Sequence, residues 1–143
     1  MEKELTVFLD SNILFSIAYS GKDRSRSYLL YELLEAGQIK IYISNLVLKE
    51  ATHNIKIKKP EVTPFLKTLI RHTTVLEDIL VNMNIPVQPL PVNDKIILST
   101  AIHNGIEYFL TGNEHDFRDL YNKRFYQTTV LKPAEFLYHR YQE

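Results

Sequence analysis

The sequence predicts an α/β fold in which a central, mostly parallel sheet is covered by helices. Short apolar segments typical of strands alternate along the chain with longer segments of helical periodicity. Strands separated by helices require crossover connections, which place helices on both faces of the sheet. The 143 residues, 45% of them hydrophobic, are enough for a single domain over residues 1–143 with a buried core.

Five short apolar segments are predicted to be strands. The first, Leu-Thr-Val-Phe-Leu, reads as a buried strand, and Ile-Lys-Ile-Tyr-Ile alternates between apolar and polar positions. The predicted strands cover residues 5–9, 39–43, 73–76, 107–110 and 128–131.

Helix boundary signals lie between these strands. Ser44 or Asn45 can cap a helix that Pro60 stops, and Gly105 follows the end of another. The predicted helices cover residues 12–18, 25–36, 45–57, 64–72, 94–104, 116–121 and 133–141. The stretch with prolines at 86, 89 and 91 is predicted to be an extended loop.

The composition excludes several classes of protein. The chain has no cysteine, so a metal site must use carboxylate, histidine or carbonyl ligands. No apolar run approaches the roughly 20 residues that cross a bilayer, and the charged N-terminus does not resemble a signal peptide, so a cytoplasmic protein without membrane association is expected. Seventeen basic and seventeen acidic residues cancel, so nucleic-acid binding would need metals, local patches or a partner.

Three acidic residues lie where strands end or where a helix face is apolar. Asp10 directly follows the first strand, and Asp94 opens the apolar stripe of its helix. Glu50 shares a helix face with Leu46 and Val47, where an unpaired charge is costly. Alternatively, Asp10 and Asp94 are helix caps, and Glu50 reaches solvent from the edge of its stripe.

A further polar group follows the fourth predicted strand. Gly112 permits a sharp turn, and Thr111, Asn113 and Asp116 bring oxygen atoms to the same region. The alternative is a plain turn with Asp116 as a helix cap. His115 could bind a metal, although a lone loop histidine is more often simply exposed.

These positions should converge, because the carboxyl ends of parallel strands meet at one edge of the sheet. Several carboxylates placed together repel and raise one another's pKa values, and a hard cation removes that conflict. Mg²⁺ and Mn²⁺ prefer oxygen ligands and support phosphodiester cleavage. The pattern therefore indicates an acidic metal site.

The order of these motifs resembles a known family. An apolar strand followed by Asp-Ser-Asn, a helical Glu, Asn-Asp-Lys-Ile-Ile-Leu-Ser-Thr-Ala and Phe-Leu-Thr-Gly-Asn-Glu-His-Asp-Phe is similar to PIN domains. It resembles most the prokaryotic VapC-like group of toxin–antitoxin nucleases, and the closing Lys-Pro-Ala-Glu-Phe-Leu is similar to that family's last helix. The resemblance implies a three-layer α/β/α sandwich.

The resemblance also implies an endoribonuclease dependent on Mg²⁺ or Mn²⁺. Asp10, Glu50 and Asp94 match the family's core acids, and Asn12 matches a polar position beside the first. Asp116 would be the fourth catalytic carboxylate, so that Asp10, Asp94 and Asp116 hold the metal while Glu50 completes the site or acts as base.

Two further residues would support this site. Thr111 would orient a metal-bound water or a carboxylate by hydrogen bonding. Asn113 stands where many family members carry an acid, a difference that bears on a second metal and on activity.

The family further implies RNA as substrate, an antitoxin partner and a homodimer. Candidate phosphate contacts are basic residues, each of which is more often a plain solvated charge. They are Lys22, Arg24, Arg26, Lys56, Lys58, Lys59 and Lys95.

Other functions remain open from the sequence. A PIN fold with weak or no catalysis could act as an RNA- or protein-binding module, which the neutral charge and Asn113 favour. A phosphatase using Asp10 as nucleophile would need a well-placed lysine and a later acidic pair, and would leave Glu50 unexplained. A phospho-receiver domain would need paired acids near the first strand, and Glu2 and Glu4 are too early for that pair.

Overall fold

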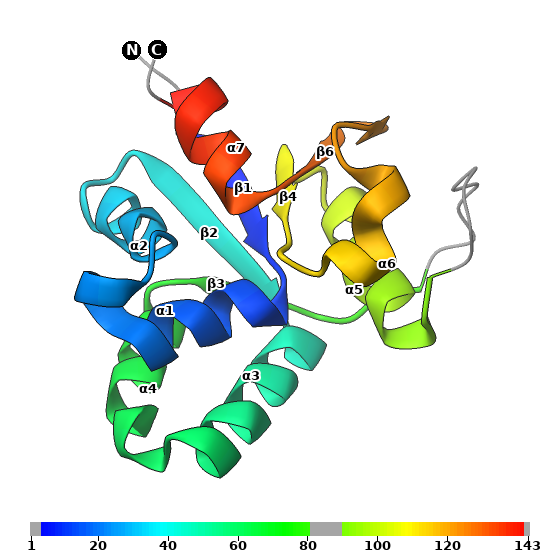
Figure 1. Ribbon diagram of the computed structural model, residues 1–143. Coiled ribbons are helices and arrows are strands. Elements are labelled where there is room, and N and C mark those ends of the chain that lie inside the picture. Colours follow the sequence, from blue (N-terminus) through cyan, green and yellow to red (C-terminus); the bar gives the residue numbers. More distant parts are fainter. Residues whose placement is uncertain (1–3, 81–89, 142–143) are drawn as a thin grey trace.

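The computed structural model describes residues 4–80 and 90–141, and its centre is a six-stranded sheet (Figure 1). The strands lie in the order β3-β2-β1-β4-β6-β5; every neighbouring pair is parallel except β5 and β6. The strands are β1 (Leu5–Leu9), β2 (Ile39–Ser44), β3 (Thr74–Leu76), β4 (Tyr108–Leu110), β5 (Arg124–Phe125) and β6 (Thr128–Leu131).

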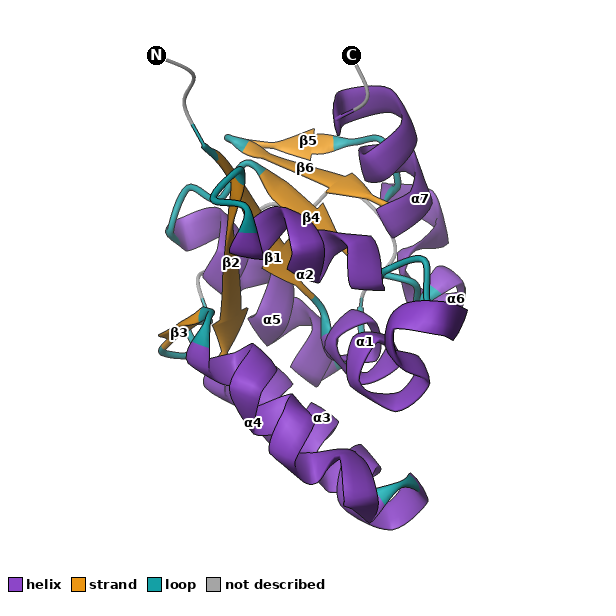
Figure 2. Ribbon diagram, turned by 90° about the vertical axis from the view of Figure 1, so that its left-hand side faces the viewer, coloured by secondary structure: helices purple, strands orange, loops and turns teal. Residues whose placement is uncertain are grey.

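Helices cover both faces of this sheet. Figures 1 and 2 show α1 and α2 on one face and α5 on the other, which confirms the predicted α/β/α architecture. The α-helices are α1 (Ser11–Arg24), α2 (Tyr28–Glu35), α3 (Asn45–Lys58), α4 (Thr63–Arg71), α5 (Val92–His103), α6 (Glu114–Phe117) and α7 (Pro133–Glu135). Short 3-10 turns cover Pro60–Val62 and Arg118–Leu120, and a π-helical segment covers Phe136–Tyr141.

The core forms where the central strands meet the helices. In β1, Val7, Phe8 and Leu9 are buried, as expected for a strand with helices on both sides. Phe8 stacks on Phe109 of β4 at 5.5 Å between ring centroids, and Phe109 contacts Phe117 at the same distance. The aromatic contacts tie β1 and β4 to the helix that follows β4.

The chain order creates a switch point at the centre of the sheet. From β1 the chain adds β2 and β3 on one side, and later β4 and β6 on the other. Ligands of open α/β sheets bind beyond the carboxyl ends of strands at such a point. Here that point is the gap between the loops that follow β1 and β4.

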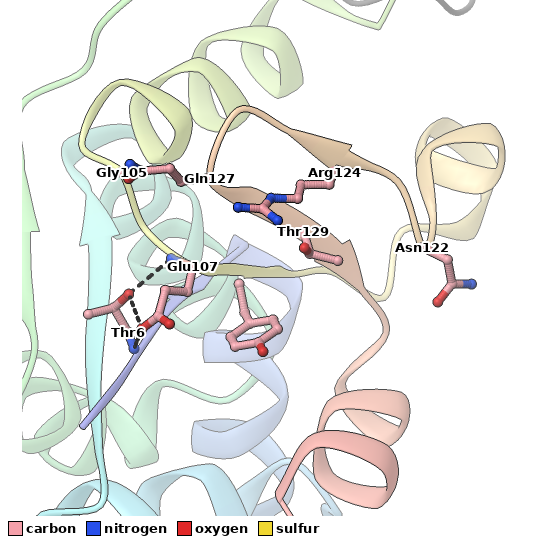
Figure 3. A pocket seen from close by; sticks show the side chains of 8 residues that line it. Thr6, Gly105, Glu107, Asn122, Arg124, Gln127 and Thr129 are labelled. Carbon is pink, nitrogen blue, oxygen red and sulfur yellow. Dashed lines mark hydrogen bonds between the residues drawn. The ribbon is translucent and has the colours of Figure 1, made fainter. Parts of the chain in front are cut away.

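The amino edge of the sheet is different in character. Thr6 and Glu107 clamp β1 to β4, because Thr6 N donates to Glu107 Oε1 at 3.0 Å and Glu107 N donates to Thr6 Oγ1 at 2.9 Å. Arg124 and Thr129 help to line an open hollow of about 640 Å³ beside this clamp (Figure 3). Among the described residues that line this hollow, Glu107 is the one acid.

Several boundaries differ from the sequence expectations. The first helix runs from Ser11 to Arg24, and Gly21, with φ 67°, kinks it. The two-residue strand β5 was not predicted, because Arg-Phe is too short to show alternation. The predicted loop prolines at 86 and 89 lie outside the described residues, and Pro91 directly precedes α5.

Among the described residues, no helix combines the length and apolar character needed to cross a membrane.

The helix that carries Glu50 depends on its N-cap. Ser44 is fully buried, and its Oγ accepts a hydrogen bond from Val47 N at 3.3 Å. Ser27 precedes α2 in the same way but forms no side-chain cap. The pair offers a matched test of what the cap contributes.

We expect Ser44→Ala to lower the free energy of unfolding by about 1 kcal/mol, because an orphan helix N–H loses its acceptor. Ser27→Ala should change it by less than about 0.5 kcal/mol. Urea denaturation of both variants measures the difference. Equal losses in the two variants would contradict a specific role for the Ser44 cap.

Candidate active site

The candidate site begins at the ends of the two central strands. Asp10 follows β1 and Thr111 follows β4, and their N–H groups extend the sheet by donating to Leu110 O at 3.0 Å and Leu131 O at 3.2 Å. Both side chains are buried, with Asp10 only 2% exposed. The switch point therefore presents an acid and a hydroxyl on adjacent strands.

Hydrogen bonds hold the Asp10 carboxylate in place. Its Oδ1 accepts from Ser11 N at 2.8 Å, which makes Asp10 the N-cap of α1. Its Oδ2 accepts from Thr111 Oγ1 at 2.8 Å and from Asn12 Nδ2 at 3.3 Å. The capping alternative and the site position are thus compatible, since one residue occupies both.

Burial dominates the ionisation of this group. Desolvation raises the pKa of Asp10 to about 6, although the hydrogen bonds from Thr111 and Ser11 act in the opposite direction. The negative charge of Glu50 adds to the increase. Near neutral pH the site therefore holds an ionised carboxylate that is poorly solvated.

Asn12 joins the two strand-end loops. Its Oδ1 accepts from Gly112 N at 2.9 Å, while its Nδ2 faces Asp10 and lies 3.5 Å from Thr111 Oγ1. A Cβ at position 112 would lie 3.3 Å from Asn12 Oδ1, so glycine permits the close approach of the loops. Asn12 is a positioning residue for Asp10.

Glu50 approaches the same region from α3. Its Oε1 accepts from Ser11 Oγ at 2.8 Å, and its Oε2 lies 3.5 Å from Asn93 Nδ2. Val47 and Ala51 are fully buried on either side of it along the helix, whereas Glu50 is half-buried. Glu50 therefore lies at the edge of its apolar stripe, directed toward the strand ends.

Asp94 and Asp116 form a carboxyl pair. Burial, then a hydrogen bond with Asp116, then the negative charges of Asp10, Asp116 and Glu50 raise the pKa of Asp94 to about 7. Hydrogen bonds from Asn113, His115 and Asp94 lower the pKa of Asp116. A proton shared by this pair therefore resides on Asp94.

The loop after β4 determines where Asp116 lies. Asn113, rather than Asp116, caps α6: its Oδ1 accepts from Asp116 N at 3.2 Å, and its Nδ2 donates to Asp116 Oδ2 at 2.9 Å. Asn113 N also donates to Thr111 Oγ1 at 3.1 Å. His115 lies 3.0 Å from Asp116 Oδ1, but its side chain is 94% exposed. The alternative in which Asp116 is the cap was therefore wrong.

Asp94 is not a cap either. It lies in the first turn of α5, and the cap position is occupied by Pro91, which offers no side-chain acceptor. The positive end of the helix dipole favours its ionised form, against the burial and neighbouring acids that favour the protonated form. The Asp94 side chain is therefore not used as a helix cap and pairs with Asp116 instead.

Three neighbouring residues were not singled out from the sequence. Ser11 and Asn93 contact Glu50, and Tyr121 donates from its hydroxyl to Thr111 O at 2.8 Å. Burial, then the charges of Glu114 and Asp10, raises the pKa of Tyr121 to about 12, so it stays a donor. Ser11 and Asn93 directly adjoin Asp10 and Asp94 in the chain, and this adjacency was the available signal.

The group offers only oxygen and amide ligands, as a hard divalent cation would require. Over residues 4–80 and 90–138, whose side chains the structure describes, no lysine or arginine forms an ion pair with Asp10, Glu50, Asp94 or Asp116. Within the same residues, no group of three or more histidine or acidic side chains is already arranged so that it could hold a metal ion. The oxygen ligands of this group fit a hard cation. The side chains would have to move closer to one another to bind it.

A family model of the PIN domain matches residues 6–115, which include Asp10, Glu50, Asp94 and Thr111. The chain belongs to the PIN domain family. The match covers most of the chain and favours this assignment over the phosphatase and receiver alternatives. Asp116 lies one residue beyond the matched segment.

A solved structure shares the PIN fold of this chain. It is the crystal structure of VapBC2 from Rickettsia felis bound to a DNA fragment from their promoter. The TM-score is 0.65 and the sequence identity 19%, over 90% of this chain and 98% of that chain. No curated protein matches this PIN domain in sequence.

The raised carboxyl pKa values of this PIN domain predict how its stability depends on pH without metal. Asp10 has a folded pKa of about 6 against 3.8 for the ordinary group, and Asp94 one of about 7. The folded state therefore binds more protons, and stability should fall as pH rises from about 4 to about 7.

With EDTA present, Asp10→Asn should remove the part of this stability loss that comes from Asp10. That part is up to about 3 kcal/mol for a pKa raised by two units. Urea unfolding at pH 4.5 and pH 7.5 measures it for wild type and variant. The remaining slope belongs to Asp94 and the other groups. Parallel pH profiles in the two proteins would contradict the raised pKa of Asp10.

Proposed function

We propose that this PIN domain is a metal-dependent endoribonuclease and the toxin of a toxin–antitoxin pair. The observation that carries the proposal is the convergence of Asp10, Glu50, Asp94 and Asp116 in mutual electrostatic reach, without a lysine or arginine partner among the side chains that the structure describes. Such a group is stabilised by a cation, and phosphodiester cleavage is the chemistry that such sites support.

The side chains of the site would have different roles. Asp10, Asp94 and Asp116 would hold Mg²⁺ or Mn²⁺ directly or through water. Once bound, the ion would supply a Lewis acid that activates water and offsets phosphate charge. Thr111 and Asn12 would keep Asp10 in one orientation through their hydrogen bonds.

Glu50 would complete the site or accept the proton of the attacking water. Ser11 and Asn93 fix its two oxygens, which leaves lone pairs on each for a further contact. In-line attack of water on the phosphorus would break the P–O3′ bond. The products would be a 5′-phosphate and a 3′-hydroxyl.

The proposed partner is an antitoxin. The support is the shared fold with a chain of VapBC2, whose complex was solved on a DNA fragment from their promoter. Homodimer formation, RNA as substrate and a cytoplasmic location belong to the same proposal through the family.

A second candidate is a PIN domain with weak or no catalysis that binds RNA or protein. Asn113 favours this second candidate. Its side chain forms hydrogen bonds with Asp116, whereas an acid at this position would add a metal ligand. The lack of a ready three-residue metal set among the described residues favours it too. Metal binding separates the two candidates.

We expect the wild type to bind Mn²⁺ or Mg²⁺ in titration calorimetry and to cut RNA, and Asp10→Asn to lose both while remaining folded. Asp119→Asn, which changes an exposed aspartate on the adjacent 3-10 turn, is the matched control and should behave as wild type. No heat of binding at millimolar metal would favour the non-catalytic candidate, and undiminished cutting by Asp10→Asn would overturn the mechanism.

Thr111 gives an independent test of orientation. Thr111→Val keeps the shape but removes the donor to Asp10, and should weaken Mn²⁺ binding about 10- to 100-fold, as loss of an outer-shell partner does. Thr111→Ser keeps the hydroxyl and should retain most of the affinity. Equal affinities for Val and Ser at this position would rule out the hydrogen bond as the cause.

A further inference from the structure

Helices α1 and α3 pack against each other and start together at the acidic site. Their first contact is Ser11 Oγ to Glu50 Oε1 at 2.8 Å. From Ser11, Phe15 and Tyr19 follow at intervals of four residues, about 6 Å along the helix each. One face of α1 therefore leads from the acids along its seam with α3, which Figure 1 shows below the sheet.

This seam carries an aromatic pair near the protein surface. The rings of Phe15 and Tyr19 stack at 5.1 Å between centroids with an interplanar angle of 25°. Tyr19 is 39% exposed and Phe15 is half-buried. Partly exposed stacked rings beside a site are a surface on which a flat base can lie.

Each ring is accompanied by a lysine from the end of α3. Lys58 Nζ lies 5.4 Å from the Phe15 ring centroid, and Lys59 Nζ lies 5.2 Å from that of Tyr19. Lys59 Nζ also donates to Tyr19 O at 3.1 Å. In the part of the chain that the structure describes, neither ammonium forms an ion pair, so their charges are available to an anion.

Further basic residues lie in the last turns of the two helices. Lys22 and Arg24 lie in the last turn of α1, and Lys56 joins Lys58 in the last turn of α3. Acids lie among them as well, since Asp23 is next to Lys22 and Glu61 follows Lys59 by two residues. Lys22 follows the kink at Gly21 and lines a hollow with α2. The cations shown beside the seam are therefore Lys58 and Lys59, while carboxylates lie at its start.

We propose that this seam is a binding path for single-stranded RNA that leads to the acidic site. The proposal rests on the proposed function, because it names how that substrate is held. Tyr19, the more exposed ring, stacks with an unpaired base, and Phe15 supports the Tyr19 ring from the core side. Lys58 and Lys59 contact the flanking phosphates. A duplex hides its base faces, so the path selects single strands.

The test measures binding without cleavage, in EDTA, by fluorescence anisotropy of a labelled 12-nucleotide single-stranded RNA and its duplex. The wild type should prefer the single strand. Tyr19→Leu should weaken single-strand binding about tenfold through loss of stacking. Lys58→Gln with Lys59→Gln should reduce the slope of log affinity against log salt by about 1.4, since each single-strand phosphate contact contributes about 0.7.

Two matched variants control for fold and for overall charge. Tyr19→Phe keeps the ring, and Lys40→Gln removes an exposed lysine from β2, so both should bind RNA as the wild type does. Wild-type affinity in Tyr19→Leu and in the double lysine variant would overturn the path, even if the protein cuts RNA. Weakened binding in those variants, with no cutting by the wild type, would keep the path and overturn the proposed nuclease function.

Discussion

The buried carboxylate of Asp10 is the constraint around which the rest of the site is arranged. An acid at 2% exposure is costly unless hydrogen bonds or a cation compensate for the lost water. The backbone of α1, the hydroxyl of Thr111 and the amide of Asn12 all converge on it. These contacts connect the first helix to the loop after β4. The arrangement of the residues at the switch point therefore depends on the Asp10 carboxylate.

The compensation is incomplete, and this shapes the chemistry. Hydrogen bonds lower the pKa of Asp10, yet it stays raised because burial and Glu50 outweigh them. Asp94 is raised further by the acids around it. A protein optimised only for stability would place an apolar side chain or an ion pair here. In the proposed function, a bound cation would offset this uncompensated negative charge.

Much of this arrangement could be predicted from sequence, because its signals are local. The apolar run before Asp10, the Ser44 cap and the glycine after α5 mark element ends, and parallel topology then brings the strand ends together. Contacts between distant residues could not be predicted. Whether Asn113 or Asp116 caps α6 depends on the hydrogen bonds of one turn, and Tyr121 reaches Thr111 only through the fold.

The switch point also has a consequence for synthesis of the chain on the ribosome. Asp10 and Glu50 emerge early, whereas Asp94, Thr111 and Asp116 lie at least 44 residues further along the sequence than Glu50. Thr111 is moreover fixed to Leu131 of the still later strand β6. A nascent or prematurely terminated product therefore holds half of the carboxylates without the strand that aligns them. The acidic site therefore forms only after β6 has been synthesised, which delays any activity of this site until the domain can fold.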